Sequence, residues 1–506
     1  MKAAWILCMS TLVTMSCKPS KKHVADGAAS EVEASRNRPY GGGTGAYLPP
    51  RTSRTFNVMG PLVVDDLTAF DKDLEAAQAS GVQAVTLDLW WGRFQPQLGT
   101  IDWSQYTEAA AHVIKKGFKF VPILSFHRCG GNVGDVCAVP LPSWVWGELA
   151  RQAGGGLTAE DMKYKGENGE INEDAVPVWA RRWSLPLYQT AMNSFRSEFI
   201  DQLARKLGTD RAGALAWIPE INISLGPSGE LRYPSYDDTS ADQQRRYPSR
   251  GNFMGYSQLA AKDYAAWSGA KGVTNAKVPE RDALAKLLEE AAQGRVSEEA
   301  ARLFAWYHES LTEHGRGVLA AAFRTFSGPE HKATDIGAKI PGIHWRIGWS
   351  DRAQPTLHYM DRFAELMAGV IPLAPATGID CDPRRDGCGY RGTLQMFRAV
   401  AGADSGRFVL HFTAVEMDDC DSNCYGTNHK PKTLVKWVGD EAKTAGVRLK
   451  GENALAGSLG DQRAFRLMRR ALDECNYEGI TLLRLSDLGR GGVTEEFAQL
   501  IRTYTQ

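Results

Sequence analysis

The sequence has no excess of either charge and no long apolar run. Lysine and arginine together number 59, as do aspartate and glutamate, so the formal net charge is zero. Because proteins that bind nucleic acids need a basic surface to neutralise phosphates, this balance disfavours a nucleic-acid partner. No stretch reaches the length of about 18 consecutive apolar residues that spans a bilayer, so the sequence predicts no transmembrane helix.

The short motifs of nucleotide and zinc sites are also missing. No GxGxxG follows an early predicted strand, which disfavours a dinucleotide-binding domain. The cysteine spacings are not CxxC and no histidine lies at zinc-finger spacing, which disfavours a zinc site. With 43% hydrophobic and 23% charged residues, the composition is ordinary for a folded protein and excludes a fibrous or disordered chain.

The N-terminus has the pattern of an export signal. Lys2 gives a positive start, an apolar stretch of about 13 residues follows, and Cys17 ends a segment that resembles a bacterial lipoprotein cleavage box. We expect three segments: a signal peptide over 1–17, a flexible linker over 18–55 and a catalytic domain over 56–506. Thr14 stands where such boxes usually have leucine, so a simple cleaved signal and a non-exported chain stay open as alternatives. The first interpretation makes Cys17 a lipid anchor and the protein a cell-envelope lipoprotein; the second makes it secreted.

Cysteine usage agrees with export. Of the nine cysteines, six form close sequence pairs: Cys129/Cys137, Cys381/Cys388 and Cys420/Cys424. Each pair closes a small loop, which predicts disulfides in an oxidising compartment. Cys475 is the odd one and lies in an amphipathic helical pattern, so we expect a buried free thiol.

Beyond residue 55, short apolar runs alternate with helical patterns. Eight strands are predicted, over Phe56–Val64, Gln83–Trp91, Lys119–His127, Ala214–Leu225, Ile336–Trp345, Phe408–Met417, Val447–Leu455 and Ile480–Asp487. Helical patterns lie between them, among them 187–206 and 283–326. This alternation predicts an α/β fold, a (β/α)8 TIM barrel with long loops after strands 3 and 4. A doubly wound sheet is the alternative. We expect a monomer.

Polar residues gather where these apolar strands end. They are Asp88, His127, Glu230, Lys339, His344, Thr413, Glu416, Glu452, Asn453, Arg484 and Asp487. Charged groups in apolar strands are costly unless they pair or face a ligand. Any one of them can be a satisfied ion pair, but as a set they indicate a binding site at the C-terminal edge of a barrel.

Two carboxyl groups on this edge suggest glycoside hydrolysis, which needs one protonated acid and one ionised carboxylate. Glu230 and Glu452 follow strands on nearly opposite sides of the barrel. Glu220 is a second candidate for the acid and ranks below Glu230, since it lies closer to the strand body. Four aromatic residues offer flat faces for sugar rings or belong to the core: Trp90, Trp91, Tyr233 and Trp345. Spacing alone leaves retaining and inverting chemistry open.

Several strings resemble the β-amylases of glycoside hydrolase family 14, in the order of that family. They are LDLWWG (87–92), SFHRCGGNVGD (125–135), GPSGELRYPSY (226–236), AKIPGIHW (338–345), FTAVEM (412–417), GENAL (451–455) and LLRLSD (482–487). YPSRGNF (247–253) is similar to the bacterial branch. The resemblance runs from about Asn57 to the end of the chain and implies the same barrel fold.

The resemblance implies exo-hydrolysis of α-1,4-glucan (starch or maltodextrin) from non-reducing ends, releasing β-maltose with inversion. It gives Glu230 the role of general acid and Glu452 that of general base. The matching sugar-binding positions are Asp88, His127, Asp135, Lys339, His344, Thr413, Asn453, Ala454 and Arg484. The disulfide of the family's bacterial members falls on Cys129 and Cys137.

One departure concerns metal. Bacterial relatives can bind a structural calcium through carboxylates after WWG, but here 93–97 has no acidic residue, so calcium is doubtful and we expect no cofactor. Two other functions stay open: a non-catalytic glucan-binding lipoprotein on a dead barrel, and a retaining barrel glycosidase acting on another glycan. Loss of either glutamate would favour the first, and a product of retained anomeric configuration would favour the second.

Overall fold

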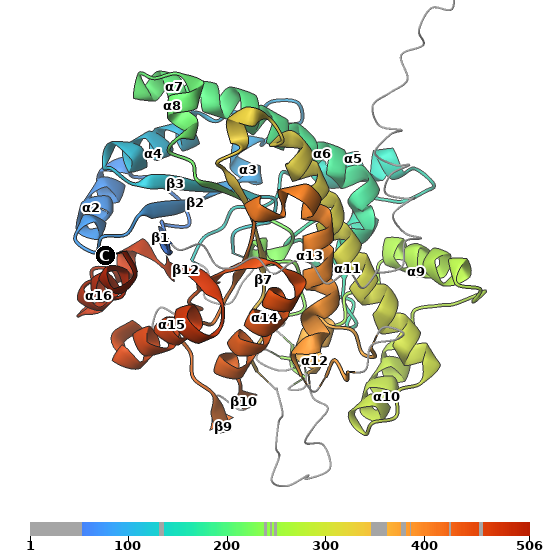
Figure 1. Ribbon diagram of the computed structural model, residues 1–506. Coiled ribbons are helices and arrows are strands. Elements are labelled where there is room, and N and C mark those ends of the chain that lie inside the picture. Colours follow the sequence, from blue (N-terminus) through green and yellow to red (C-terminus); the bar gives the residue numbers. More distant parts are fainter. Residues whose placement is uncertain are drawn as a thin grey trace, which may run out of the picture. The chain divides into compact units, whose positions relative to one another are not determined.

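Eight parallel strands close into a barrel in the computed structural model (Figure 1). They are β1 (Thr55–Met59), β2 (Ala84–Trp90), β3 (Lys119–Ser125), β6 (Glu220–Ile223), β7 (Asp335–Ile340), β8 (Phe408–Phe412), β11 (Arg448–Glu452) and β12 (Tyr477–Leu483). Their order around the barrel is β1-β12-β11-β8-β7-β6-β3-β2. The predicted TIM barrel is therefore confirmed.

The structure describes residues 53–130, 136–236, 240–242, 245–246, 250–345, 362–375, 381–384, 386–424, 427–454 and 459–505. All of them belong to one compact unit, Gly42–Gln506. The expected signal peptide, Cys17 and nearly all of the expected linker lie outside the described residues and stay predictions. None of the helices in the described part is both long and apolar enough to cross a membrane.

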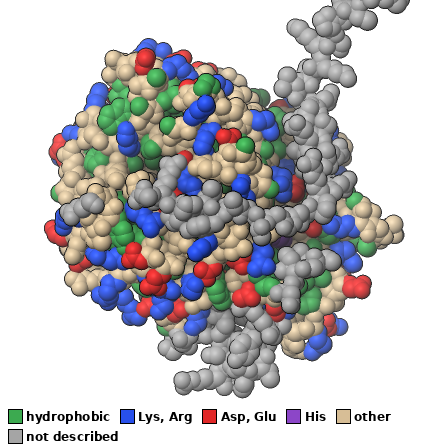
Figure 2. Space-filling view, viewed as in Figure 1, with side chains coloured by type: hydrophobic (Ala, Val, Ile, Leu, Met, Phe, Trp, Pro, Cys, Tyr) green, Lys and Arg blue, Asp and Glu red, His purple; other side chains and the backbone are tan. Residues whose placement is uncertain are grey.

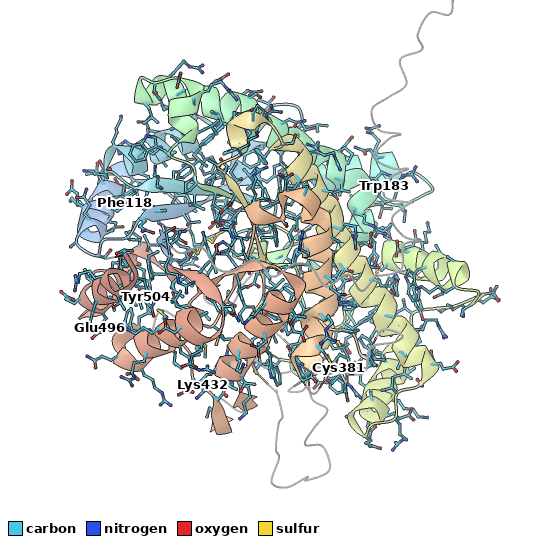
Figure 3. All side chains as sticks on the ribbon, viewed as in Figure 1. Phe118, Trp183, Cys381, Lys432, Glu496 and Tyr504 are labelled. Atoms are coloured by element: carbon cyan, nitrogen blue, oxygen red, sulfur yellow. A yellow bond between two sulfur atoms is a disulfide. The ribbon has the colours of Figure 1, made fainter. Side chains whose placement is uncertain are left out.

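Amphipathic helices cover the barrel. The main ones are α2 (Leu67–Gln78), α4 (Ser104–Lys115), α6 (Arg181–Ser194), α7 (Ile200–Leu207), α11 (Glu298–Thr325), α13 (Arg391–Ala401), α14 (Pro431–Ala445), α15 (Gln462–Glu474) and α16 (Val493–Thr505). Helix α15 shows the pattern, since it buries Phe465, Met468 and Leu472 and exposes charged residues on its other face. Tyr504 of α16, labelled in Figure 3, packs on Phe56 of β1 with ring centroids 6.2 Å apart, so the last helix covers the first strand.

Two predicted boundaries were wrong for local reasons. The helix expected over 283–326 is two helices, α10 (Arg281–Ala292) and α11. Gly294 takes a φ of +83° between them, and the Ser297 side chain accepts a hydrogen bond from the Ala300 N–H and starts α11 anew. The strand expected over 214–225 begins only at Glu220, because Ala214 lies in the short helix α8 (Arg211–Leu215), which the Asp210 side chain caps.

The long loops expected after the third and fourth strands are present. The first, between β3 and α6, carries α5 (Trp144–Ala153) and a hairpin of β4 (Tyr164–Lys165) and β5 (Ile171–Asn172). The second, between β6 and α11, carries α9 (Gln258–Ala270) and α10. A buried aromatic stack ties both loops to α11: Tyr233 lies on Tyr307 at 3.8 Å and Trp179 on Trp306 at 5.2 Å. Figure 1 shows α11 running beside α6 and α13.

Two of the three predicted disulfides are formed in the described residues, Cys129–Cys137 and Cys381–Cys388. The side chain of Cys424 lies outside them, so the pair with Cys420 stays a prediction. Cys475 is a buried free thiol, as expected. On the visible surface, basic and acidic side chains are interspersed, in line with the zero net charge (Figure 2).

Candidate active site

Glu230 lies at the C-terminal edge of the barrel, just beyond β6. Its backbone forms a parallel bridge with Lys339 of β7, and the Leu231 N–H donates to the Lys339 carbonyl at 2.8 Å. The Arg232 Nε donates to Glu230 Oε2 at 2.8 Å. Burial, helped by the negative charge of Glu452, raises the pKa of Glu230 above its usual value although Arg232 opposes this. With 13% of its side chain exposed, the carboxyl group is nearly enclosed and still reachable.

A tight turn in GPSGELR presents this carboxyl group. A Cβ on Gly226 would lie 2.6 Å from the Glu230 carbonyl and 2.8 Å from the Arg232 carbonyl, so only glycine lets the chain fold back here. Gly229 takes a φ of +79°, which also favours glycine. The glycines of GPSGELR are therefore a geometric requirement of the turn before the carboxyl group.

Glu452 ends β11 in a strongly basic setting. Lys339 Nζ lies 2.8 Å from its Oε2, and His411 Nδ1 lies 3.2 Å from its Oε1. Burial alone would raise the pKa of Glu452, but the two cations outweigh it and lower the pKa to about 2. This carboxylate is therefore ionised at neutral pH.

The pKa values of the two carboxyl groups are thus shifted in opposite directions, for reasons that the geometry supplies. β6 and β11 are separated in the barrel by β7 and β8, so the groups face each other across part of the rim. One carboxyl group with a raised pKa and another with a lowered pKa form the arrangement that acid–base catalysis by a carboxyl pair requires.

Asp88 and His127 lie on the neighbouring side of the rim. Ser125 Oγ donates to Asp88 Oδ1 at 2.8 Å, and burial raises the pKa of Asp88 although Lys339 opposes this. His127 Nδ1 lies 2.8 Å from Ser224 Oγ, and burial lowers the pKa of His127 to about 3. His127 is therefore a neutral hydrogen-bonding group.

His344 and Thr413 are joined through one residue. His344 Nδ1 lies 2.8 Å from the Gly342 carbonyl, and the Gly342 N–H donates to Thr413 Oγ1 at 2.8 Å. Burial lowers the pKa of His344 to about 4, so it is neutral as well. The loops after β7 and β8 are therefore coupled at the rim.

Asn453, Ala454 and Arg484 tie the ends of β11 and β12 to each other and to the segments that follow β8 and β1. Asn453 exchanges two hydrogen bonds with the Leu483 backbone, at 2.6 and 3.1 Å. The Ala454 N–H donates to the Glu416 carboxylate at 2.9 Å, and Arg484 Nη1 donates to the Gly60 carbonyl at 3.2 Å. The Asn453 amide thus has a structural role that sequence reasoning did not include. Asp135 lies outside the described residues.

Of the four aromatic residues for which sugar platform and core were both open, two belong to the core. Trp91 and Tyr233 are fully buried; Trp91 Nε1 donates to Gln95 Oε1 at 2.8 Å. Trp90 and Trp345 keep only 3% and 4% exposure, and Trp90 packs edge-on against His127. Ring burial against the loop insertions, which periodicity cannot reveal, decides this outcome.

Sequence reasoning missed Arg232 and His411, and ranked Glu220 as a weaker candidate acid. Arg232 is 1% exposed and hydrogen-bonds Glu230. Its guanidinium lies 4.0 Å from the Tyr236 ring centroid. His411 lies in β8 inside an apolar run, which was the available signal. Glu220 is buried below the rim and its Oε1 lies 2.6 Å from His411 Nε2. Glu220 therefore belongs to an ion pair inside the barrel and does not lie on the rim.

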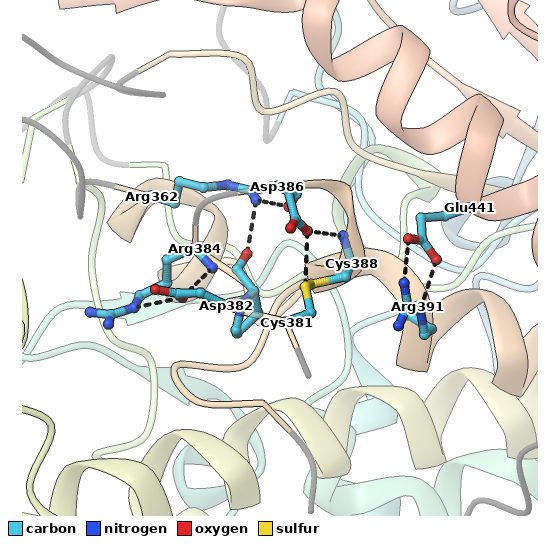
Figure 4. Close-up of a disulfide and its surroundings, with 9 residues drawn as sticks. Arg362, Cys381, Asp382, Arg384, Asp386, Cys388, Arg391 and Glu441 are labelled. Carbon is cyan, nitrogen blue, oxygen red and sulfur yellow. Dashed lines mark hydrogen bonds and ion pairs between the residues drawn. A yellow bond between two sulfur atoms is a disulfide. The ribbon is translucent and has the colours of Figure 1, made fainter. Parts of the chain in front are cut away.

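The residues present do not fit a metal ion where calcium was considered. In 93–97, Arg93 pairs with Asp65 at 2.6 Å. Among the described residues, Cys381, Asp386 and Cys388 lie close enough together to hold a metal ion, but the two sulfurs form a disulfide with each other. Figure 4 shows that this loop is closed by hydrogen bonds, including one from the Cys388 N–H to Asp386 Oδ1 at 2.8 Å.

Comparisons with known proteins agree with this geometry. The model of glycosyl hydrolase family 14 matches residues 57–504. A thermophilic β-amylase of Thermoanaerobacterium thermosulfurigenes is 33% identical, covering 88% of this chain and 73% of the relative. A β-amylase of Cytobacillus firmus is 32% identical, covering 85% and 82%. The crystal structure of the catalytic domain of a Paenibacillus polymyxa β-amylase superposes with a TM-score of 0.69 at 30% identity, covering 89% of this chain and 98% of that domain.

Proposed function

The chain belongs to glycosyl hydrolase family 14, and we propose that it is a β-amylase that cleaves α-1,4-glucans from non-reducing ends and releases β-maltose with inversion. The observation that carries this proposal is a pair of buried carboxyl groups, Glu230 and Glu452, placed around Lys339 at one edge of the barrel, whose pKa values are shifted in opposite directions. An inverting mechanism needs an acid on one face of the sugar ring and a base with its water on the other.

Glu230 acts as the general acid. Burial raises its pKa, which favours the protonated form that an acid needs. Arg232, at 2.8 Å, fixes the carboxyl group and can stabilise the carboxylate that forms after transfer. The proton passes to the glycosidic oxygen as the bond to the anomeric carbon breaks.

Glu452 acts as the general base. Its ionised carboxylate takes a proton from water while the water oxygen attacks the anomeric carbon from the face opposite the leaving oxygen, which gives the β-anomer. The Lys339 ammonium holds one carboxylate oxygen at 2.8 Å. Asp88, His127, His344, Thr413 and Arg484 line the same rim, and we assign them to sugar hydroxyls.

We also propose that the protein is exported. Two formed disulfides support an oxidising compartment, and the segment before Cys17 supports lipid attachment. Labelling of growing cells with a palmitate analogue is expected to mark the wild type and not Cys17→Ser; secretion without label would favour a simple cleaved signal.

Proton NMR of fresh maltoheptaose with the purified protein tests the activity. The expected result is β-maltose as the first product, before mutarotation, and loss of turnover in Glu230→Gln and Glu452→Gln. Early α-maltose contradicts inversion, and glucan binding without product supports a non-catalytic sensor.

A further inference from the structure

We infer that His411, paired with Glu220, is a positioning residue that keeps the proposed base Glu452 ionised. This inference rests on the proposed function. His411 is 2% exposed, against 6% for Lys339 and Glu452, so its effect on the reaction passes through Glu452.

The barrel interior contains a column of charges in place of the usual apolar layers. Side chains at every second strand position point inward, and on β11 these are Arg448, Lys450 and Glu452, at three successive levels. His411 of β8 is in register with Lys339 of β7 on one side and Lys450 of β11 on the other. The middle level therefore connects directly to the base above it.

The contacts of His411 join two carboxylates. Its Nε2 lies 2.6 Å from Glu220 Oε1, and its Nδ1 lies 3.2 Å from Glu452 Oε1. Lys450 Nζ donates to the other Glu220 oxygen at 2.5 Å. His411, Glu220 and Lys450 are 2%, 1% and 4% exposed, so water does not substitute for these partners.

The charge count of this column requires a cationic His411. The bottom level pairs Arg448 with Asp335 and Glu478, and the two levels above add Glu220, Glu452, Lys339 and Lys450. That gives four anions and three cations, so a protonated His411 makes the column neutral. A buried ion without a counter-charge is strongly destabilising, which favours the neutral column. Glu220 is the group that holds the proton on His411, since burial would otherwise remove it.

Each oxygen of the Glu452 carboxylate thus has its own cation. Lys339 holds Oε2 and, as a rim residue, also faces the sugar site. His411 Nδ1 lies 3.2 Å from Oε1, at ion-pair distance. His411 therefore keeps a positive charge beside the carboxylate even while Lys339 contacts substrate.

A matched pair of variants tests the inference. Glu220→Gln and Glu478→Gln are the same isosteric change at sites 1% and 2% exposed, but only Glu220 contacts His411. We expect Glu220→Gln to lower kcat on maltoheptaose about tenfold to a hundredfold, with KM within about twofold. The acidic limb of its kcat–pH profile is expected to rise by about one pH unit, because Glu452 loses a neighbouring cation. Glu478→Gln is expected to leave that limb in place.

Equal losses of kcat in the two variants with no movement of the limb, or an unchanged Glu220→Gln, would overturn the inference. A wild type that forms no β-maltose would instead reject the proposed function. A second measurement uses the wild type alone: nitrogen NMR with labelled histidine. Burial lowers the pKa of His127 and His344 to about 3 and about 4, whereas Glu220 raises the pKa of His411 above its usual value, so His411 should give an imidazolium signal at a pH where those two rings are neutral. A spectrum without an imidazolium signal at that pH contradicts the inference even if the variants do not fold.

Discussion

Replacing Lys339 by methionine removes the cation that lies 2.8 Å from Glu452. The surroundings bring the pKa of Glu452 from 4.5 to about 2, a difference worth about 3 kcal/mol at about 1.4 kcal/mol per pKa unit. Burial is the largest single influence on the pKa of Glu452, and it raises that pKa. In the variant, of the two cations that contact Glu452, only His411 is left to oppose burial. We expect the pKa of Glu452 to rise by about one to two units.

The direction of the pH effect follows from the base being active when ionised. In the wild type, kcat should persist as pH falls until the protein unfolds, since Glu452 loses its charge only near pH 2. In the variant, kcat should fall through about pH 4 while the protein is still folded. The same lowered pKa contributes stability above about pH 4.5 that is lost as pH falls toward the folded value, and the variant should lose part of it.

The assay is kcat at saturating maltoheptaose across the acidic range, with circular dichroism at each pH to separate lost catalysis from unfolding. Saturation matters because Lys339 is also one of the predicted sugar-binding residues, so its loss is expected to raise KM. Lys339→Arg keeps the charge and serves as the control, with an acidic limb close to that of the wild type. A folded Lys339→Met protein whose kcat keeps the wild-type acidic limb would refute the reasoning.

Three further outcomes are expected. Glu230→Gln should lower kcat on maltoheptaose by about a hundredfold to ten-thousandfold but cleave 4-nitrophenyl α-maltoside with a far smaller loss, because that leaving group needs little protonation; equal losses on both substrates would argue against an acid role. Arg448→Met removes the cation that pairs with the buried carboxylates of Asp335 and Glu478, and it should cost about 3 to 5 kcal/mol in urea unfolding. A smaller cost than that of an exposed Arg151→Met change would be contrary to the geometry. Replacing Cys129 and Cys137 by serine opens a loop of sequence separation 8 and should lower the free energy of unfolding by about 2 to 3 kcal/mol. Differential scanning calorimetry with and without reductant would check this. Reduction of this bridge should destabilise the wild type and have no counterpart in the variant.

Much of the fold could be predicted because its signals are local. Eight apolar runs separated by helical patterns correspond to the eight barrel strands, and the rim residues follow the strand ends. The predictions failed where a single local cue ended an element, as at Gly294 between two helices. The family strings also carry local geometry, since the turn before Glu230 permits only glycine at Gly226.

Position along a strand decides which edge of a parallel barrel a residue reaches, so the rim carboxyl groups could be predicted from the order of residues alone. The direction in which each pKa is shifted depends on the closed barrel. Lys339 and Glu452 are 113 residues apart, and His411 and Glu220 are 191 apart, so their pairing exists only once the barrel closes. Burial and these distant partners set the two pKa values apart. Burial by the loop insertions likewise made core residues of Trp91 and Tyr233, since exposure depends on what packs over a strand and not on the residues within it.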